Sequence, residues 1–178
     1  MAVNDKDVAE WKDRFNGVLA RPAEHVNHTS SGGSWLSSFF GCCDPIDLCL
    51  MTYCLPCVTF GKTHHRLRKD PSLQGYEPIN TSCLLLCGSA CFGLHWIPMS
   101  MQRADIREKY NLEGNCLVDI AASCCCGLCV LVQSEKEATA HAGDAPAGGV
   151  KQEYQAQGGM TYPAAAAAPA APAAAAPQ

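Results

Sequence analysis

The cysteine content restricts the fold of this chain more than any other feature. Thirteen cysteines lie between Cys42 and Cys129 of a chain of 178 residues. Such a density is typical of disulfide scaffolds, metal-binding domains and S-acylated membrane proteins. Because residues 1–20 contain no apolar stretch like that of a secretory signal, we expect a reducing compartment, in which structural disulfides are rare. Metal binding, buried structural thiols and S-acylation therefore stay open as roles for the cysteines.

Composition divides the chain into three parts. In residues 1–38, apolar side chains recur with a helical period over residues 5–20, and a linker rich in glycine and serine follows. This helix either lies on a membrane or packs against its own domain or a partner. Residues 39–138 hold the cysteines and form the predicted domain. Residues 139–178 are dominated by alanine and proline and are predicted to be disordered.

The longest uncharged stretch, residues 78–102, predicts contact with a lipid bilayer. Its centre, residues 83–101, is largely apolar, and a helix of that length is close to the thickness of a bilayer core. The predicted fold class is therefore mainly α, a small Cys-rich membrane-associated helical domain with a disordered Ala/Pro-rich C-terminal tail. Since one membrane segment cannot enclose a pore alone, we expect a homo-oligomer. The alternative is a central helix of a soluble Cys-rich core.

Two Cys-x-x-Cys pairs are the strongest metal-binding signal. Cys54 and Cys57 form the first pair, and Cys126 and Cys129 form the second. Each pair points two thiolates at one ion, and together they can complete a tetrahedral four-thiolate site. Thiolates prefer soft ions, so the pattern indicates soft divalent metals and makes zinc the candidate cofactor. Alternative ligands are the adjacent cysteine pairs at residues 42–43 and 124–125.

One acid and one basic segment carry further hypotheses. Asp119 lies in the second cysteine-rich block, and an acid embedded in a membrane usually marks an ion path or binding site. Alternatively, Asp119 is the N-cap of a helix over residues 120–132. Residues 62–69 combine four basic side chains with two histidines and are predicted to form a solvated loop or to contact anionic lipid.

Several functions are excluded by the sequence. A net charge of −4 argues against a nucleic-acid-binding surface. No catalytic signature is present, whether a nucleophile elbow, a zinc-protease motif, a phosphate-binding loop or a dinucleotide fingerprint. A thioredoxin-like dithiol needs a βαβ pattern around its two cysteines, and none follows Cys54 and Cys57. We therefore expect that the protein is not an enzyme.

Three sequence blocks resemble those of the placenta-specific gene 8 Cys-rich family, which includes plant cadmium resistance proteins and cell-number regulators. The first block, C-L-x-x-x-C-x-P-C-x-x-x-G, begins at Cys49. The second, R-x-K-Y-x-L-x-G, begins at Arg107 and is followed by Asp119. The third is a cysteine cluster followed by Q-x-E-x-E from Gln133. The resemblance implies a small membrane-associated protein, often at the plasma membrane, whose plant relatives act in zinc or cadmium efflux and in organ size.

The leading hypothesis is a membrane-associated Cys-rich protein that binds or helps to export zinc or cadmium. Its predicted partners are a lipid bilayer, further copies of the chain and soft divalent metal ions, without nucleic acid. The alternative is a non-transporting membrane scaffold or regulator of growth or calcium signalling, with structural or acylated cysteines. A third hypothesis is a soluble zinc-binding adaptor. The predicted metal-site residues are Cys54, Cys57, Cys126, Cys129 and Asp119.

Overall fold

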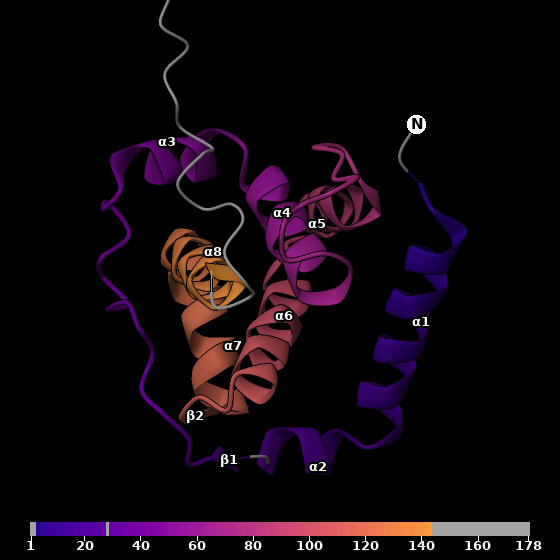
Figure 1. Ribbon diagram of the computed structural model, residues 1–178. Helices are drawn as coiled ribbons and strands as arrows, with labels where there is room; N and C mark the ends of the chain where they lie inside the picture. The colour runs from indigo at the N-terminus through magenta and orange to yellow at the C-terminus, as the bar shows by residue number, and fades with distance from the viewer. Residues whose placement is uncertain (1–2, 28, 144–178) are drawn as a thin grey trace, which may run out of the picture.

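The structure is mainly helical, as the sequence predicted. The computed structural model describes residues 3–27 and 29–143. Within these residues the chain forms eight helices and one two-stranded antiparallel sheet (Figure 1). The predicted disordered tail lies outside the described residues from position 144 onward, and helix α8 occupies its beginning at residues 139–143.

Most neighbouring elements are joined by short connections, but longer ones precede α3, over residues 31–45, and α5, over residues 69–80. The strands β1 and β2 pair Thr29 with Asn115 and Ser30 with Gly114. In chain order, the helices and strands are α1 Asp5–Ala20, α2 Pro22–Asn27, β1 Thr29–Ser30, α3 Ile46–Cys54, α4 Pro56–Arg68, α5 Thr81–Cys91, α6 Trp96–Lys109, β2 Gly114–Asn115, α7 Cys116–Cys125 and α8 Gly127–Gly143. The expected linker over residues 21–38 therefore contains a short helix and a strand.

Helix α1 has the bounds that the apolar period predicted. The Asn4 side chain caps it by accepting a hydrogen bond from the backbone N–H of Lys6. Trp11 is 3% exposed, and its indole N–H donates to the hydroxyl of Ser82 at 3.1 Å. Of the alternatives for this helix, packing against its own domain is therefore correct.

The main core lies where α4, α5, α6 and α8 meet. Helix α4 packs against both α5 and α8, and the long helices α6 and α8 also lie against each other (Figure 1). The ring of Phe60 stacks against Trp11 with a centroid distance of 5.9 Å, which joins α1 to the core. The buried apolar residues of this cluster are Trp11, Phe60, Leu86, Met99, Val130 and Leu131.

The prediction of one membrane-crossing helix over residues 83–101 is wrong. Helix α5 ends at Cys91, and Gly93 adopts a positive φ of 71°, which glycine tolerates better than other residues. The chain turns there and begins α6 at Trp96. Within the ranges 3–27 and 29–143, no helix is both long and apolar enough to traverse a bilayer.

The prediction of a solvated loop at residues 62–69 is also wrong. Most of the segment belongs to α4, and His64, His65 and Arg66 are buried. Burial, reinforced by the nearby positive charges of Arg14 and Arg68, lowers the pKa of His64 to about 3. This imidazole is therefore neutral near pH 7 and stacks on the Trp11 ring at a centroid distance of 4.9 Å. It is a core side chain and not a lipid contact.

Candidate metal centre

Asp119 lies in a buried ion-pair network that joins α6 and α7. Its two carboxylate oxygens accept hydrogen bonds from the Nε atoms of Arg103 at 3.0 Å and Arg107 at 3.1 Å. Arg103 also donates to the side chain of Gln133 at 2.7 Å, and its guanidinium lies 4.0 Å from the ring centre of Trp35. Both carboxylate oxygens are thus engaged by cations, and the structure gives Asp119 a role in holding helices together.

The alternative that Asp119 caps a helix is wrong. Helix α7 begins three residues earlier, at Cys116, and its cap is the Asn115 side chain, which accepts a hydrogen bond from the backbone N–H of Val118 at 2.9 Å. The predicted single helix over residues 120–132 is divided at Cys126 into α7 and α8. Asp119 therefore lies in the first turn of α7, with its side chain directed to the arginines.

A second buried network surrounds Glu135 on α8. Its carboxylate accepts hydrogen bonds from the Thr63 hydroxyl at 2.8 Å and from Arg66 Nε at 3.2 Å, both on α4. The Lys62 ammonium lies 3.7 Å from the same carboxylate. Asp119 and Glu135, which belong to two of the family sequence blocks, are thus charged residues of the domain interior.

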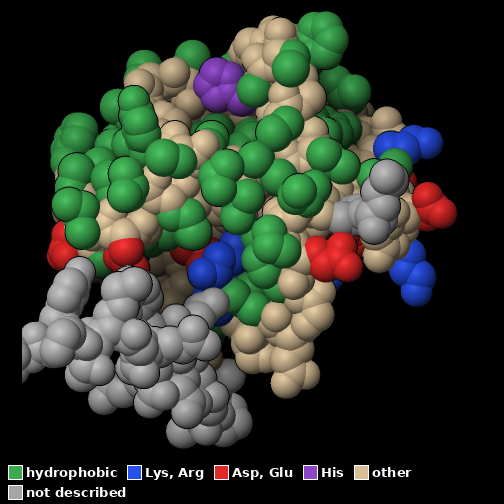
Figure 2. Space-filling view, turned by 90° about the horizontal axis from the view of Figure 1, so that it is seen from above, with side chains coloured by type: hydrophobic (Ala, Val, Ile, Leu, Met, Phe, Trp, Pro, Cys, Tyr) green, Lys and Arg blue, Asp and Glu red, His purple; other side chains and the backbone are tan. Residues whose placement is uncertain are grey.

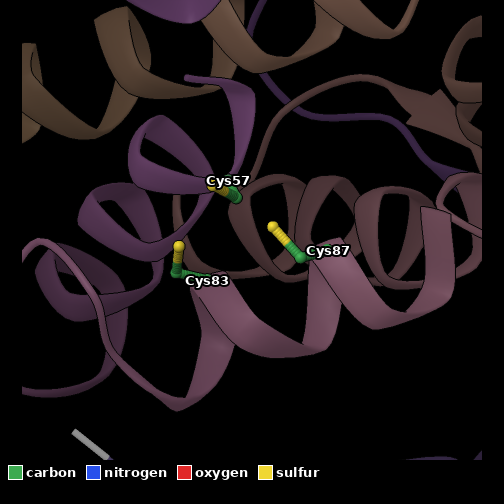
Figure 3. Close-up of side chains that lie close together, drawn as sticks. All are labelled: Cys57, Cys83 and Cys87. Carbon is green, nitrogen blue, oxygen red and sulfur yellow. The ribbon is translucent and has the colours of Figure 1, made fainter. Parts of the chain in front are cut away.

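Three thiols form the candidate metal centre. The Sγ atoms of Cys57, Cys83 and Cys87 all lie within 4.8 Å of one another (Figure 3). Cys57 follows Pro56 in the first turn of α4, while Cys83 and Cys87 lie one turn apart on α5. We call these three residues the thiol triad. Cys83 is buried, Cys57 is half-buried and Cys87 is exposed, so the triad is accessible from one side.

The close approach of α4 and α5 brings the triad together. Gly61 permits this approach, because a Cβ atom at that position would lie 2.6 Å from the side-chain oxygen of Asn80. That same oxygen caps α5 by accepting a hydrogen bond from the backbone N–H of Cys83 at 2.9 Å. The glycine on α4 and the cap of α5 therefore fix the position of Cys83 relative to Cys57.

The electrostatic surroundings keep the triad protonated when no ion is bound. Burial raises the pKa of the thiols of Cys57, Cys83 and Cys87 above their ordinary value, and contacts among the three thiols add smaller effects. A metal ion binds thiolates and must therefore displace protons from this site. Occupancy of the triad by a metal ion would therefore depend on pH.

A cavity of about 590 Å³ adjoins the triad. Cys57 and Cys87 are part of its wall, so the accessible side of the triad faces it. Several further side chains in the wall carry sulfur or an imidazole, which are the preferred ligand atoms of soft metals. The wall residues of this kind are Cys54, Cys57, Cys87, His95, Met99, Cys124 and Cys125.

The predicted ligands are distributed over several places. Cys57 belongs to the triad, and Cys54 is exposed at the wall of the adjoining cavity. Cys129 lies against Cys42 and Cys126. Within the described part of the chain, the two Cys-x-x-Cys pairs do not form a common four-thiol cluster. Sequence reasoning missed Cys83 and Cys87, although their spacing of four residues places two thiols on one face of a helix.

These features define the protein as a small cysteine-rich helical domain with a buried ion-pair framework and a candidate centre for soft metals. The chain belongs to the PLAC8 family, whose sequence profile matches residues 35–137. No solved structure matches the chain.

Two plant relatives illustrate the similarity. Cell number regulator 9 of Zea mays is 32% identical over 155 residues, which cover 82% of this chain and 86% of the relative. The Arabidopsis thaliana protein named PLANT CADMIUM RESISTANCE 1 is 29% identical over 135 residues, which cover 72% of this chain and 83% of the relative. The family resemblance inferred from the three sequence blocks is therefore confirmed.

Proposed function

We propose that the chain binds soft divalent metal ions, such as zinc or cadmium, at the thiol triad. The observation that carries this proposal is the clustering of three Sγ atoms within 4.8 Å of one another. Zinc and related ions take thiolate ligands readily, and three protein ligands leave a fourth coordination position open. The names of relatives such as PLANT CADMIUM RESISTANCE 1 support the same class of ion.

The open fourth position favours exchange of the ion over permanent structural binding. Structural zinc sites are usually closed by four protein ligands, whereas an open site can accept another ligand. The cavity beside Cys57 and Cys87 holds further thiols, an imidazole and a thioether that can complete the coordination. The proposed role is therefore to hold an ion and hand it on, without catalysis, as metal resistance or efflux requires.

Metal analysis of the purified full-length protein tests this proposal. After incubation with zinc and a thiol reductant, followed by removal of free metal, the Cys57→Ser/Cys83→Ser/Cys87→Ser variant should contain one zinc ion fewer per chain than the wild type. Cys116→Ser is the matched control, because Cys116 is a half-buried thiol outside the triad, and it should leave the zinc content unchanged. Equal zinc content in the triad variant and the wild type would refute the proposal.

A second candidate function is that of a scaffold attached to a membrane surface, and an exposed apolar face favours it. Seen from above, hydrophobic side chains cover much of the upper part of the view, and most charged groups lie in a band below them (Figure 2). Ile46, Leu50 and Tyr53 on α3 are all at least 63% exposed, although they are large and apolar. Large apolar patches on a protein surface commonly mark sites of membrane or protein contact.

Flotation of the full-length protein with phospholipid vesicles tests membrane attachment. The Ile46→Ser/Leu50→Ser variant should bind the vesicles at least roughly 100-fold more weakly, because burial of each side chain contributes about 1.5–3 kcal/mol. Leu19→Ser is the control, since Leu19 is similarly exposed but lies on α1. Vesicle binding that is the same for the double variant and the wild type would remove the support that α3 gives to this function.

A further inference from the structure

A second group of thiols lies between the start of α8 and the loop that precedes α3. The Sγ atom of Cys129, in the first turn of α8, is 3.3 Å from that of Cys42. The thiol of Cys126, which directly precedes α8, also interacts with Cys129. The row continues through Cys43, whose Sγ atom lies 3.9 Å from that of Cys49 on α3. None of these five cysteines belongs to the thiol triad.

We infer that Cys42, Cys126 and Cys129 form a second binding site for a soft metal ion, with Cys43 and Cys49 available to complete its coordination. We call this group the loop site. Its three principal thiols come from two segments that are far apart in the sequence but adjacent in the fold. The inference does not depend on the thiol triad, because the two groups share no residue.

Two pairs of sulfur atoms in this group are as close together as the sulfur ligands of one metal ion. In a tetrahedral site with metal–sulfur bonds of ~2.3 Å, two sulfur ligands lie about 3.8 Å apart. The two measured separations, 3.3 Å for Cys42 and Cys129 and 3.9 Å for Cys43 and Cys49, lie on either side of this value. The Sγ atoms of Cys42, Cys126 and Cys129 do not all lie within 4.8 Å of one another, so side chains must rotate to surround an ion.

Polar side chains of α8 hold the loop in place. Glu137 accepts a hydrogen bond from the backbone N–H of Leu36 at 3.0 Å, and Gln133 donates to the carbonyl of Ser37 at 2.8 Å. Farther along the loop, the Lys136 ammonium donates to the carbonyls of Gly41 at 3.3 Å and Asp44 at 2.7 Å. Cys42 and Cys43 lie between the last two contacts, so the loop presents them to α8 in a fixed position.

The Sγ atoms of Cys129 and Cys42 are 3.3 Å apart, so two thiolates at these positions would repel each other. A divalent cation bound between them removes that repulsion. Soft ions are the class expected, because every donor atom in the group is sulfur.

Zinc content of the full-length protein under reducing conditions tests the loop site. The Cys42→Ser/Cys129→Ser variant should contain one zinc ion fewer per chain than the Cys116→Ser control. An unchanged zinc content in the double variant would overturn the inference. The variant that lacks the thiol triad, measured in parallel, distinguishes the two proposals, because each variant should lose only its own ion.

A milder variant keeps the inference testable if the double substitution impairs folding. Lys136→Ala removes the contacts with Gly41 and Asp44 on either side of Cys42 and Cys43 but leaves every thiol in place. The experiment uses a protein in which the triad cysteines are replaced by serine. In this background Lys136→Ala should raise the Kd of the remaining zinc ion by roughly tenfold, because loss of a supporting contact around a metal ligand commonly has an effect of this size. Competition with a chromophoric chelator measures this constant. An equal Kd with and without Lys136 would overturn the inference, because the remaining ion would then not be held by the loop that Lys136 anchors.

Discussion

Replacing Asp119 by alanine should lower the free energy of unfolding by about 3–5 kcal/mol, which is the usual cost of removing one partner from a buried ion pair. The carboxylate lies between Arg103 and Arg107, which are 5% and 2% exposed. Without it, two buried guanidinium groups lose the carboxylate that pairs with both of them. Urea unfolding followed by circular dichroism measures the change.

Two controls accompany this experiment. One tests whether the effect comes from the lost charge or from the lost volume, and the other shows the effect of breaking a surface ion pair. Asp119→Asn keeps the shape of the side chain and should still destabilise the domain strongly, because it removes the negative charge. Glu24→Ala breaks an ion pair with Arg21 in which both side chains are 70% exposed, and it should change stability little. A folded Asp119→Ala variant of wild-type stability would show that the arginines do not need this carboxylate.

This result would also decide between two interpretations of Asp119. The sequence alone indicates an ion site, because an acid in an apolar cysteine-rich segment is expensive unless it has a function. The structure supplies a different explanation, since Arg103 and Arg107 on α6 compensate the charge. Charged side chains are almost never fully buried unless they are paired. Arg103 and Arg107 lie 16 and 12 residues from Asp119, so local sequence patterns do not reveal the pairing.

Local patterns predicted the helices better than they predicted the relations between helices. The apolar period gave the correct bounds for α1, and the expected helical character of the domain is confirmed. The interpretation of residues 83–101 failed because an uncharged run has the same composition whether it crosses a bilayer or supplies two core helices. The turn around Gly93, with a positive φ, is the local feature that separates α5 from α6.

The candidate site was predicted in part for a similar reason. A Cys-x-x-Cys pair is visible as a sequence pattern, so Cys57 was identified as a ligand, and its place in the triad is consistent with that role. Its neighbours Cys83 and Cys87 come from another helix, and their approach depends on the contact of Gly61 with Asn80. Such a contact between helices has no signature at the level of residue spacing.

The affinity of the thiol triad for zinc should rise steeply with pH. Burial raises the pKa of all three thiols, so each carries its proton through the neutral range and must release it when the ion binds. Each displaced proton makes the apparent affinity about tenfold stronger per pH unit, so three protons give up to about a thousandfold per unit. The direction follows because higher pH favours the thiolate, which is the form that binds the metal.

Zinc competition titrations between about pH 6 and pH 8 measure this slope, in the Cys42→Ser/Cys129→Ser background so that only the triad is observed. The logarithm of the affinity should rise with a slope approaching three, and Cys83→Ser should reduce the slope toward two because one proton fewer is displaced. Cys116→Ser is the control and should leave the slope unchanged. A slope near zero would mean that the three thiols are not the ligands, since an ion held by other groups would not have to displace their protons.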